Sequence, residues 1–279
     1  MSSPLVLGPI LPGDWPTSST DPSYGGFKQA IFDSATTLLD SVRQAETGST
    51  SIFQKGKSFN TSDCPTQTYS SSSTVPGSGN TDGFKWHVRV STHTDVNYEQ
   101  FKQGLLENHS VNERDYIEDC QTADKIQVIN HGEMEVWRML YHQPFPASNR
   151  SFSFVIFTSE VPSSSSERSF IVVSIPVAHP DAPPEKGYVR GRYVSVEQCR
   201  QTDQGVVWTM AVASDAGGMV PKMISEKAMP SKISEDVPSF LKWIKSRPAP
   251  APSSAATTTT SGSTNDAPTL PQIDRPEAL

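Results

Sequence analysis

Six strand-like segments follow one another between residues 125 and 214, and short polar turns separate them. The turns include His131-Gly132, Gln143-Pro144 and Asp203-Gln204-Gly205, whose residue types favour reversal of the chain direction. Consecutive strands joined by short turns form an antiparallel meander, so this region predicts one antiparallel sheet. The expected strands are residues 125–130, 133–142, 151–159, 168–177, 188–199 and 206–214.

Helical patterns flank these strands on both sides in the sequence. Phe27, Ile31, Leu38 and Val42 recur at three- and four-residue steps and predict a helix over residues 26–48. After the sheet, Gly217-Gly218 frees the backbone and an amphipathic helix is expected from Met219 onward. Pro230 should break or kink this helix, because proline removes a backbone donor, and Pro238 should add a second bend or stand in a first turn.

The stretch between these parts completes an α+β order. Residues 84–93 alternate apolar and polar side chains and predict a half-buried strand. Asp95 and Asn97 can cap a short helix that follows, and a second short helix is expected over residues 113–120. We therefore expect a curved antiparallel sheet wrapped around a long C-terminal helix, with an N-terminal helix and two short helices. Such a sheet leaves an apolar tunnel wherever the facing side chains do not fill it.

Two stretches have too few large apolar side chains to offset the conformational entropy lost on folding. One is rich in Ser and Gly, and the other is a tail rich in Pro, Ser and Thr. The expected organisation is an irregular segment at 1–25, a helix at 26–48, a flexible loop at 49–83, one domain at 84–247 and a disordered tail at 248–279.

Charge and cysteine content narrow the class of protein. The net charge of −7 opposes nucleic-acid binding, which needs a positive field. No apolar run approaches the roughly 20 residues that span a bilayer, and the N-terminus lacks the pattern of a signal peptide. Three widely spaced cysteines argue against a disulfide framework. We expect a soluble protein of the reduced cytoplasm, a monomer with no nucleic-acid partner.

The common catalytic templates are missing from the sequence. It has no nucleophile elbow, no zinc-protease motif, no Cys-x-x-Cys and no phosphate loop, so we expect no catalytic residue, no metal site and no cofactor. The six histidines are scattered, as solvated surface histidines are. If the chain were an enzyme, the acid/base pairs that can be assembled are Glu135 with Arg138, and His142 with Glu133.

Three motifs in order carry a resemblance to a known family. They are the proline-rich turn and strand at residues 144–152, the run Lys186-Gly187-Tyr188-Val189-Arg190-Gly191, and Asp215-Ala216-Gly217-Gly218-Met219-Val220-Pro221. This order resembles START-like (steroidogenic-acute-regulatory-related lipid transfer) domains, especially an uncharacterised fungal family within them. The family usually has an acidic residue after the arginine of the first motif, whereas this chain has Ser151. A buried Arg–Asp pair is therefore not expected at that turn.

The resemblance implies a helix-grip fold over residues 84–247 that holds one apolar ligand, a lipid or another small molecule, without catalysis. Uptake would require the C-terminal helix or the loop at 178–185 to move, with transient membrane contact as a possible step. An interaction module with a filled core, and an enzyme on the same fold, are the alternatives. Each kind of candidate also has a structural alternative: ordinary core for Trp208 and Met210, helix core for Met219 and Met223, and solvated surface arginine for Arg138 and Arg150. The cavity candidates are Arg138, Arg150, Phe152, Phe154, Trp208, Met210, Met219 and Met223.

Overall fold

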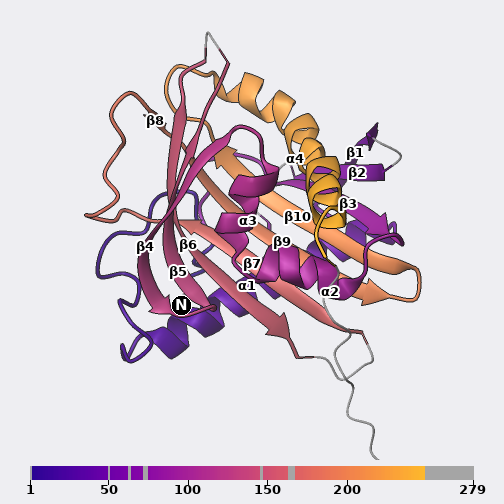
Figure 1. Cartoon of the computed structure of the whole chain (residues 1–279), viewed down its shortest axis with the longest axis horizontal. Helices are drawn as coiled ribbons and strands as arrows, with labels where there is room; N and C mark the ends of the chain where they lie inside the picture. The colour runs from indigo at the N-terminus through magenta and orange to yellow at the C-terminus, as the bar shows by residue number, and fades with distance from the viewer. Residues whose placement is uncertain are drawn as a thin grey trace, which may run out of the picture.

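The computed structural model describes residues 2–49, 51–61, 64–71, 75–144, 147–162 and 167–248. Its centre is a sheet with the strand order β1-β2-β3-β10-β9-β7-β6-β5-β4, antiparallel at every step of that order, and β8 pairs with β6 in parallel (Figure 1). The strands are β1 (Phe53–Thr61), β2 (Cys64–Ser71), β3 (His87–His93), β4 (Cys120–Asn130), β5 (Met134–Tyr141), β6 (Arg150–Val161), β7 (Ser169–Pro176), β8 (Val189–Arg190), β9 (Arg192–Thr202) and β10 (Gly205–Asp215).

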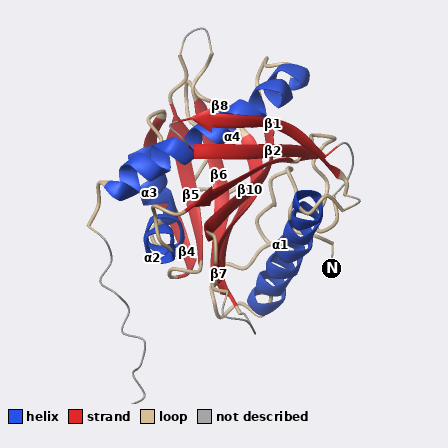
Figure 2. Ribbon diagram, turned by 90° about the vertical axis from the view of Figure 1, so that its right-hand side faces the viewer, coloured by secondary structure: helices blue, strands red, loops and turns tan. Residues whose placement is uncertain are grey.

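Helices cover both faces of this sheet, as Figure 2 shows. Helix α1 (Tyr24–Glu46) lies on the outer face, where its stripe around Ile31 and Leu38 joins Leu5 and Trp15 of the N-terminal segment in one apolar cluster. The inner face carries α2 (Tyr98–Phe101), the π-helical turn η1 (Lys102–Leu106), α3 (His109–Tyr116) and α4 (Lys222–Lys245). The curved sheet and the C-terminal helix that packs against its inner face confirm the expected α+β helix-grip architecture.

Strand periodicity assigns each side chain to one face. In β6, Phe154 and Ile156 belong to the inner cluster, whereas Val155 and Phe157 belong to the outer one. All eight residues of β7 are buried, because helices cover this central strand on both sides. Burial on two faces explains the nearly continuous apolar run that the sequence shows there.

The expected flexible loop at 49–83 is wrong for its first part, because β1 and β2 extend the sheet beyond β3. Their buried positions are largely hydroxyl side chains, which a search for apolar alternation misses. Thr68 Oγ1 donates to the carbonyl of Lys57 at 2.6 Å, and Ser71 Oγ accepts from the backbone N–H of Trp86 at 3.1 Å. These hydrogen bonds satisfy the buried polar groups and allow a Ser/Thr-rich segment to form strands.

Helix boundaries also differ from the prediction. Helix α4 begins at Lys222 rather than Met219 and continues through Pro230 and Pro238 without the expected break. Its apolar stripe, from Ile233 to Ile244, packs on the sheet and holds the helix together where prolines remove two hydrogen bonds. The second short helix, expected at 113–120, is α3 and ends at Tyr116, since Cys120 already starts β4. The expected disordered tail lies outside the described residues, apart from residue 248.

Candidate ligand-binding cavity

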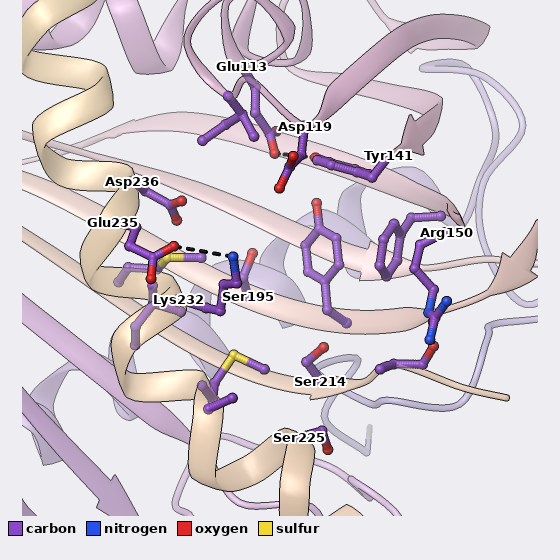
Figure 3. Close-up of a pocket in the computed structure, with 18 of the residues that line it drawn as sticks. Glu113, Asp119, Tyr141, Arg150, Ser195, Ser214, Ser225, Lys232, Glu235 and Asp236 are labelled. Atoms are coloured by element: carbon purple, nitrogen blue, oxygen red, sulfur yellow. Dashed lines mark hydrogen bonds and ion pairs between the residues drawn. The ribbon is translucent and has the colours of Figure 1, made fainter. Parts of the chain in front are cut away.

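A cavity of about 580 Å³ lies between the inner face of the sheet and the helices α3 and α4 (Figure 3). Small side chains explain the space on both walls. Ser174 of β7 and Ser195 of β9 are cross-strand partners, and both line the cavity. Opposite them, α4 contributes Ser225 and Ala228. The hollow therefore arises where short side chains face short side chains.

Large aromatic side chains fill the neighbouring part of the same layer. Trp208 of β10 and Phe240 of α4 have ring centroids 5.0 Å apart, and Phe101 lies 5.2 Å from Phe240. All three are at most 1 % exposed. This cluster fixes α4 on the sheet, so that the space beside it stays open rather than collapsing.

The cavity wall carries an excess of acids. Three residues, Arg89, Arg150 and Lys232, bring permanent positive charge. Lys232 is paired with Glu235 at 3.2 Å. Six lining residues carry carboxyl groups: Glu113, Glu118, Asp119, Glu197, Glu235 and Asp236. The lining is therefore mixed, whereas the sequence led us to expect an apolar tunnel.

Two of these carboxyl groups are held in unusual states. Burial raises the pKa of Glu113, whose Oε1 accepts from the Tyr141 hydroxyl at 2.6 Å, while His109 opposes that rise in pKa. Burial likewise raises the pKa of Asp236 to about 7, against the opposing effect of the Arg89 guanidinium. Neutral pH therefore lies within the range in which Asp236 exchanges its proton.

This raised pKa predicts how stability depends on pH. The carboxyl of Asp236 binds its proton more tightly in the folded chain than at its ordinary pKa of 3.8, so folding loses stability as pH rises from about 4 through 7. Asp236→Asn imitates the protonated form and should remove that loss. We expect the variant to gain on the order of 3 kcal/mol over the wild type between pH 4 and pH 8, measured by urea unfolding.

Glu107→Gln is the matched control, because the exposed Glu107 side chain lies outside the cavity. Its unfolding free energy should stay parallel to that of the wild type across the same range. Parallel curves for Asp236→Asn as well would contradict the raised pKa.

Arg89 is the most enclosed charge at the site. Its side chain is 1 % exposed, and its guanidinium stacks on the Trp208 ring with its carbon 3.8 Å from the ring centroid. Its Nη2 lies 3.8 Å from Glu197 Oε2, which is beyond hydrogen-bond distance. Within the described residues, neither Nε nor Nη1 has a hydrogen-bond partner.

Three of the residues expected to line a cavity do so: Arg150, Phe152 and Met210. Arg150 is buried and donates to backbone carbonyls, at 2.6 Å to Ala216 and also to Ser148, so it ties the turn before β6 to the end of β10. Among the described residues, no carboxylate is paired with Arg150. Ser151 follows it in the sequence, where the START-like family usually has an acidic residue.

The other five expected residues lie elsewhere. Phe154 and Trp208 are buried in the inner apolar cluster, as the ordinary-core alternative held for Trp208. Arg138 is on the other face of β5, where it pairs with Asp124 at 2.8 Å and Glu185 at 3.1 Å. Met219 and Met223 are 99 % and 79 % exposed, because α4 starts later than expected and turns Met223 toward solvent.

Other expected positions are also absent from the cavity wall. Among the described residues, none of 178–185 lines the cavity, and neither do the pairs considered for an enzyme. The sequence reasoning missed the polar wall, including Tyr193, Ser195 and Glu197. A signal for these three was present, since residues two apart on a strand share one face.

Comparison with known structures assigns the fold. Human StAR-related lipid transfer protein 5 superposes with a TM-score of 0.59 at 15 % identity, over 78 % of this chain and 98 % of that one. Human STARD10 gives 0.53 at 17 % identity over 74 % and 79 %, and the lipid transfer and protein localization domain of human StarD13 gives 0.55 at 12 % over 74 % and 96 %. The fold is that of the START-related lipid transfer domains, and the resemblance seen in the sequence is confirmed.

Sequence comparison then gives the family. Residues 86–244 match the family described as "Protein of unknown function (DUF3074)", and the chain belongs to it. An uncharacterized protein of Schizosaccharomyces pombe, C577.11, is 28 % identical over 169 residues, which cover 58 % of this chain and 69 % of that protein.

Proposed function

We propose that the chain is a non-enzymatic lipid-binding or lipid-transfer module that holds one ligand between the sheet and α4. The cavity of about 580 Å³ is the observation that carries this proposal, because its volume lies within the range of small-molecule sites. Every lining residue belongs to the domain expected at 84–247. The open space also favours ligand binding over an interaction module with a filled core.

The apolar part of the wall gives the ligand a reason to leave water. Val220, Ile224, Met229 and Ile233 line the cavity along α4 and the segment before it. Each 100 Å² of hydrocarbon that is buried there would contribute about 2.5 kcal/mol. The adaptable side chain of Met229 suits an apolar tail of variable shape.

Ligand exchange with a membrane would occur at the start of α4. Met219, Val220, Met223 and Ile224 form an exposed apolar patch, and two of them, Val220 and Ile224, also line the cavity. A lipid leaving a bilayer through this patch would reach the cavity without crossing water. Within the described residues, no helix has both the length and the apolarity needed to cross a membrane.

This route predicts the effect of charge at the patch. The double variant Met219→Asp and Met223→Asp should slow transfer of a fluorescent lipid between vesicles about tenfold or more, since two charges would have to enter the membrane interface. Binding of the same lipid from detergent should not change, because neither methionine lines the cavity. Val128→Asp, an exposed apolar position on β4, is the control and should leave transfer unchanged. Equal transfer by the double variant would exclude this route.

A lipid-transfer assay between vesicles is the experiment for the function itself. The wild-type chain should speed the exchange of at least one lipid class over the spontaneous rate. If the chain neither speeds transfer nor binds any amphiphile, the proposal is overturned. A cytoplasmic location, a monomeric state and the lack of a nucleic-acid partner stay predictions.

One contact favours a second candidate function, an enzyme acting on an apolar substrate. Tyr141 and Glu113 are titratable, share a 2.6 Å hydrogen bond and face the cavity. Burial raises the pKa of both groups, so each keeps its proton to a higher pH than it would in water. Release of acid from a long-chain ester by the wild type, lost in Glu113→Gln, would establish this function. No turnover by the wild type would exclude it.

A further inference from the structure

Three carboxyl groups from three separate elements line the same cavity. Glu113 comes from α3, Glu197 from β9 and Asp236 from α4, and Figure 3 shows the side chains of Glu113 and Asp236 both directed into the cavity. Glu197 accepts from the Trp208 indole N–H at 2.9 Å. In the described part of the chain, the Asp236 carboxyl has neither a hydrogen bond nor an ion pair. Of the three, only the Asp236 carboxyl is thus left without a partner among the described residues.

Arg89 points independently to a ligand group at this wall. A guanidinium that is 1 % exposed, with no hydrogen-bond acceptor for two of its nitrogens, is costly to bury. Arg89 lines the cavity, and its positive charge acts on Asp236. A ligand oxygen at this wall would accept a hydrogen bond from the Arg89 guanidinium. Donors on the same ligand would bond to the neighbouring carboxyl groups.

Resting on the proposed function, we propose that the ligand is an amphiphile whose polar head is a protonated amine next to a hydroxyl group, a long-chain amino alcohol. The ammonium group lies between Glu113 and Asp236 and donates to both. The neighbouring hydroxyl oxygen accepts from Arg89. The hydrocarbon chain extends along α4 past Met229 toward Ile224 and the exposed patch.

The wall of the cavity discriminates against other heads. A carboxylate or phosphate would meet six acidic residues and only three permanent cations, of which Lys232 is already paired and Arg150 is bound to carbonyls. An uncharged head would leave the Asp236 carboxyl without an opposite charge. The rings of Tyr193 and Phe152, with centroids 5.3 Å apart, also line the cavity.

The test compares 2-aminooctadecane-1,3-diol with its N-acetyl derivative, which keeps the chain and hydroxyls but has no charge. Octadecan-1-ol and octadecanoic acid complete the set, and binding to the full chain is measured by displacement of a fluorescent lipid. We expect the amine to bind about 30-fold or more tightly than the N-acetyl compound, because a buried charge pair is lost. Asp236→Asn should lower affinity for the amine by a similar factor and leave that for the N-acetyl compound unchanged.

Glu107→Gln should bind all four compounds as the wild type does. Glu113→Gln should lower affinity for the amine in the same way. If loss of the Tyr141 contact unfolds Glu113→Gln, the result for Asp236→Asn still decides the test. Equal or tighter binding of the N-acetyl compound or the fatty acid would overturn the inference and leave the proposed function intact. Binding of none of the four compounds, nor of any other lipid, would overturn both.

Discussion

Ser195→Phe is expected to abolish ligand binding in a chain that still folds. Ser195 is 3 % exposed and faces the cavity beside its cross-strand partner Ser174, so a phenyl ring there would occupy the space of the ligand. The added ring enters a hollow rather than a packed core, which limits the overpacking cost to about 1–3 kcal/mol or less. We expect affinity for a fluorescent lipid to fall more than about tenfold, measured by titration.

The control for this variant is Ser159→Phe, on β6 and outside the cavity wall. It should bind lipid as the wild type does. Cooperative thermal unfolding of Ser195→Phe would show that lost binding does not reflect a lost fold. Unchanged affinity in a folded Ser195→Phe chain would mean that lipid binds elsewhere.

Phe240→Ala is expected to cause the largest loss of stability. The Phe240 ring is fully buried and contacts the rings of Phe101, Trp208 and Tyr116, with centroids 5.0 to 5.4 Å away. Truncation would leave a void at the point where α4 is fixed to the sheet, and such changes cost about 3–5 kcal/mol. Urea unfolding measures the difference.

Met223→Ala is the matched control on the same helix, because its side chain is 79 % exposed. We expect a change within about 0.5 kcal/mol there. If Phe240→Ala cost no more than this control, α4 would not depend on the aromatic cluster for its position. The packing of α4 against the sheet would then need another explanation.

The fold could be predicted from the sequence where a single pattern decided the structure. Alternation along residues 206–214 and the helical stripe from Phe27 to Val42 each record the burial of one face. β1 and β2 could not be found this way, because hydroxyl side chains occupy buried positions that hydrogen bonds satisfy. The continuous α4 escaped prediction because packing of its stripe overrides the local effect of Pro230.

The cavity was harder to predict than the fold. Arg150, Phe152 and Met210 were found because they stand on strands near the motifs that carry the START resemblance. The charged wall depends on contacts between residues far apart in the chain. Arg89 and Glu197 are separated by more than a hundred positions and meet only because β3, β10 and β9 are neighbours in the sheet.

Native mass spectrometry of the intact chain, recovered from cells without detergent, tests most directly whether the space beneath α4 is a ligand site. The predicted spectrum shows a folded chain carrying one added mass in the range of a single lipid, and Ser195→Phe lacks it. A spectrum of folded wild-type chain without added mass, still free of it after incubation with mixed lipid vesicles, would contradict the account.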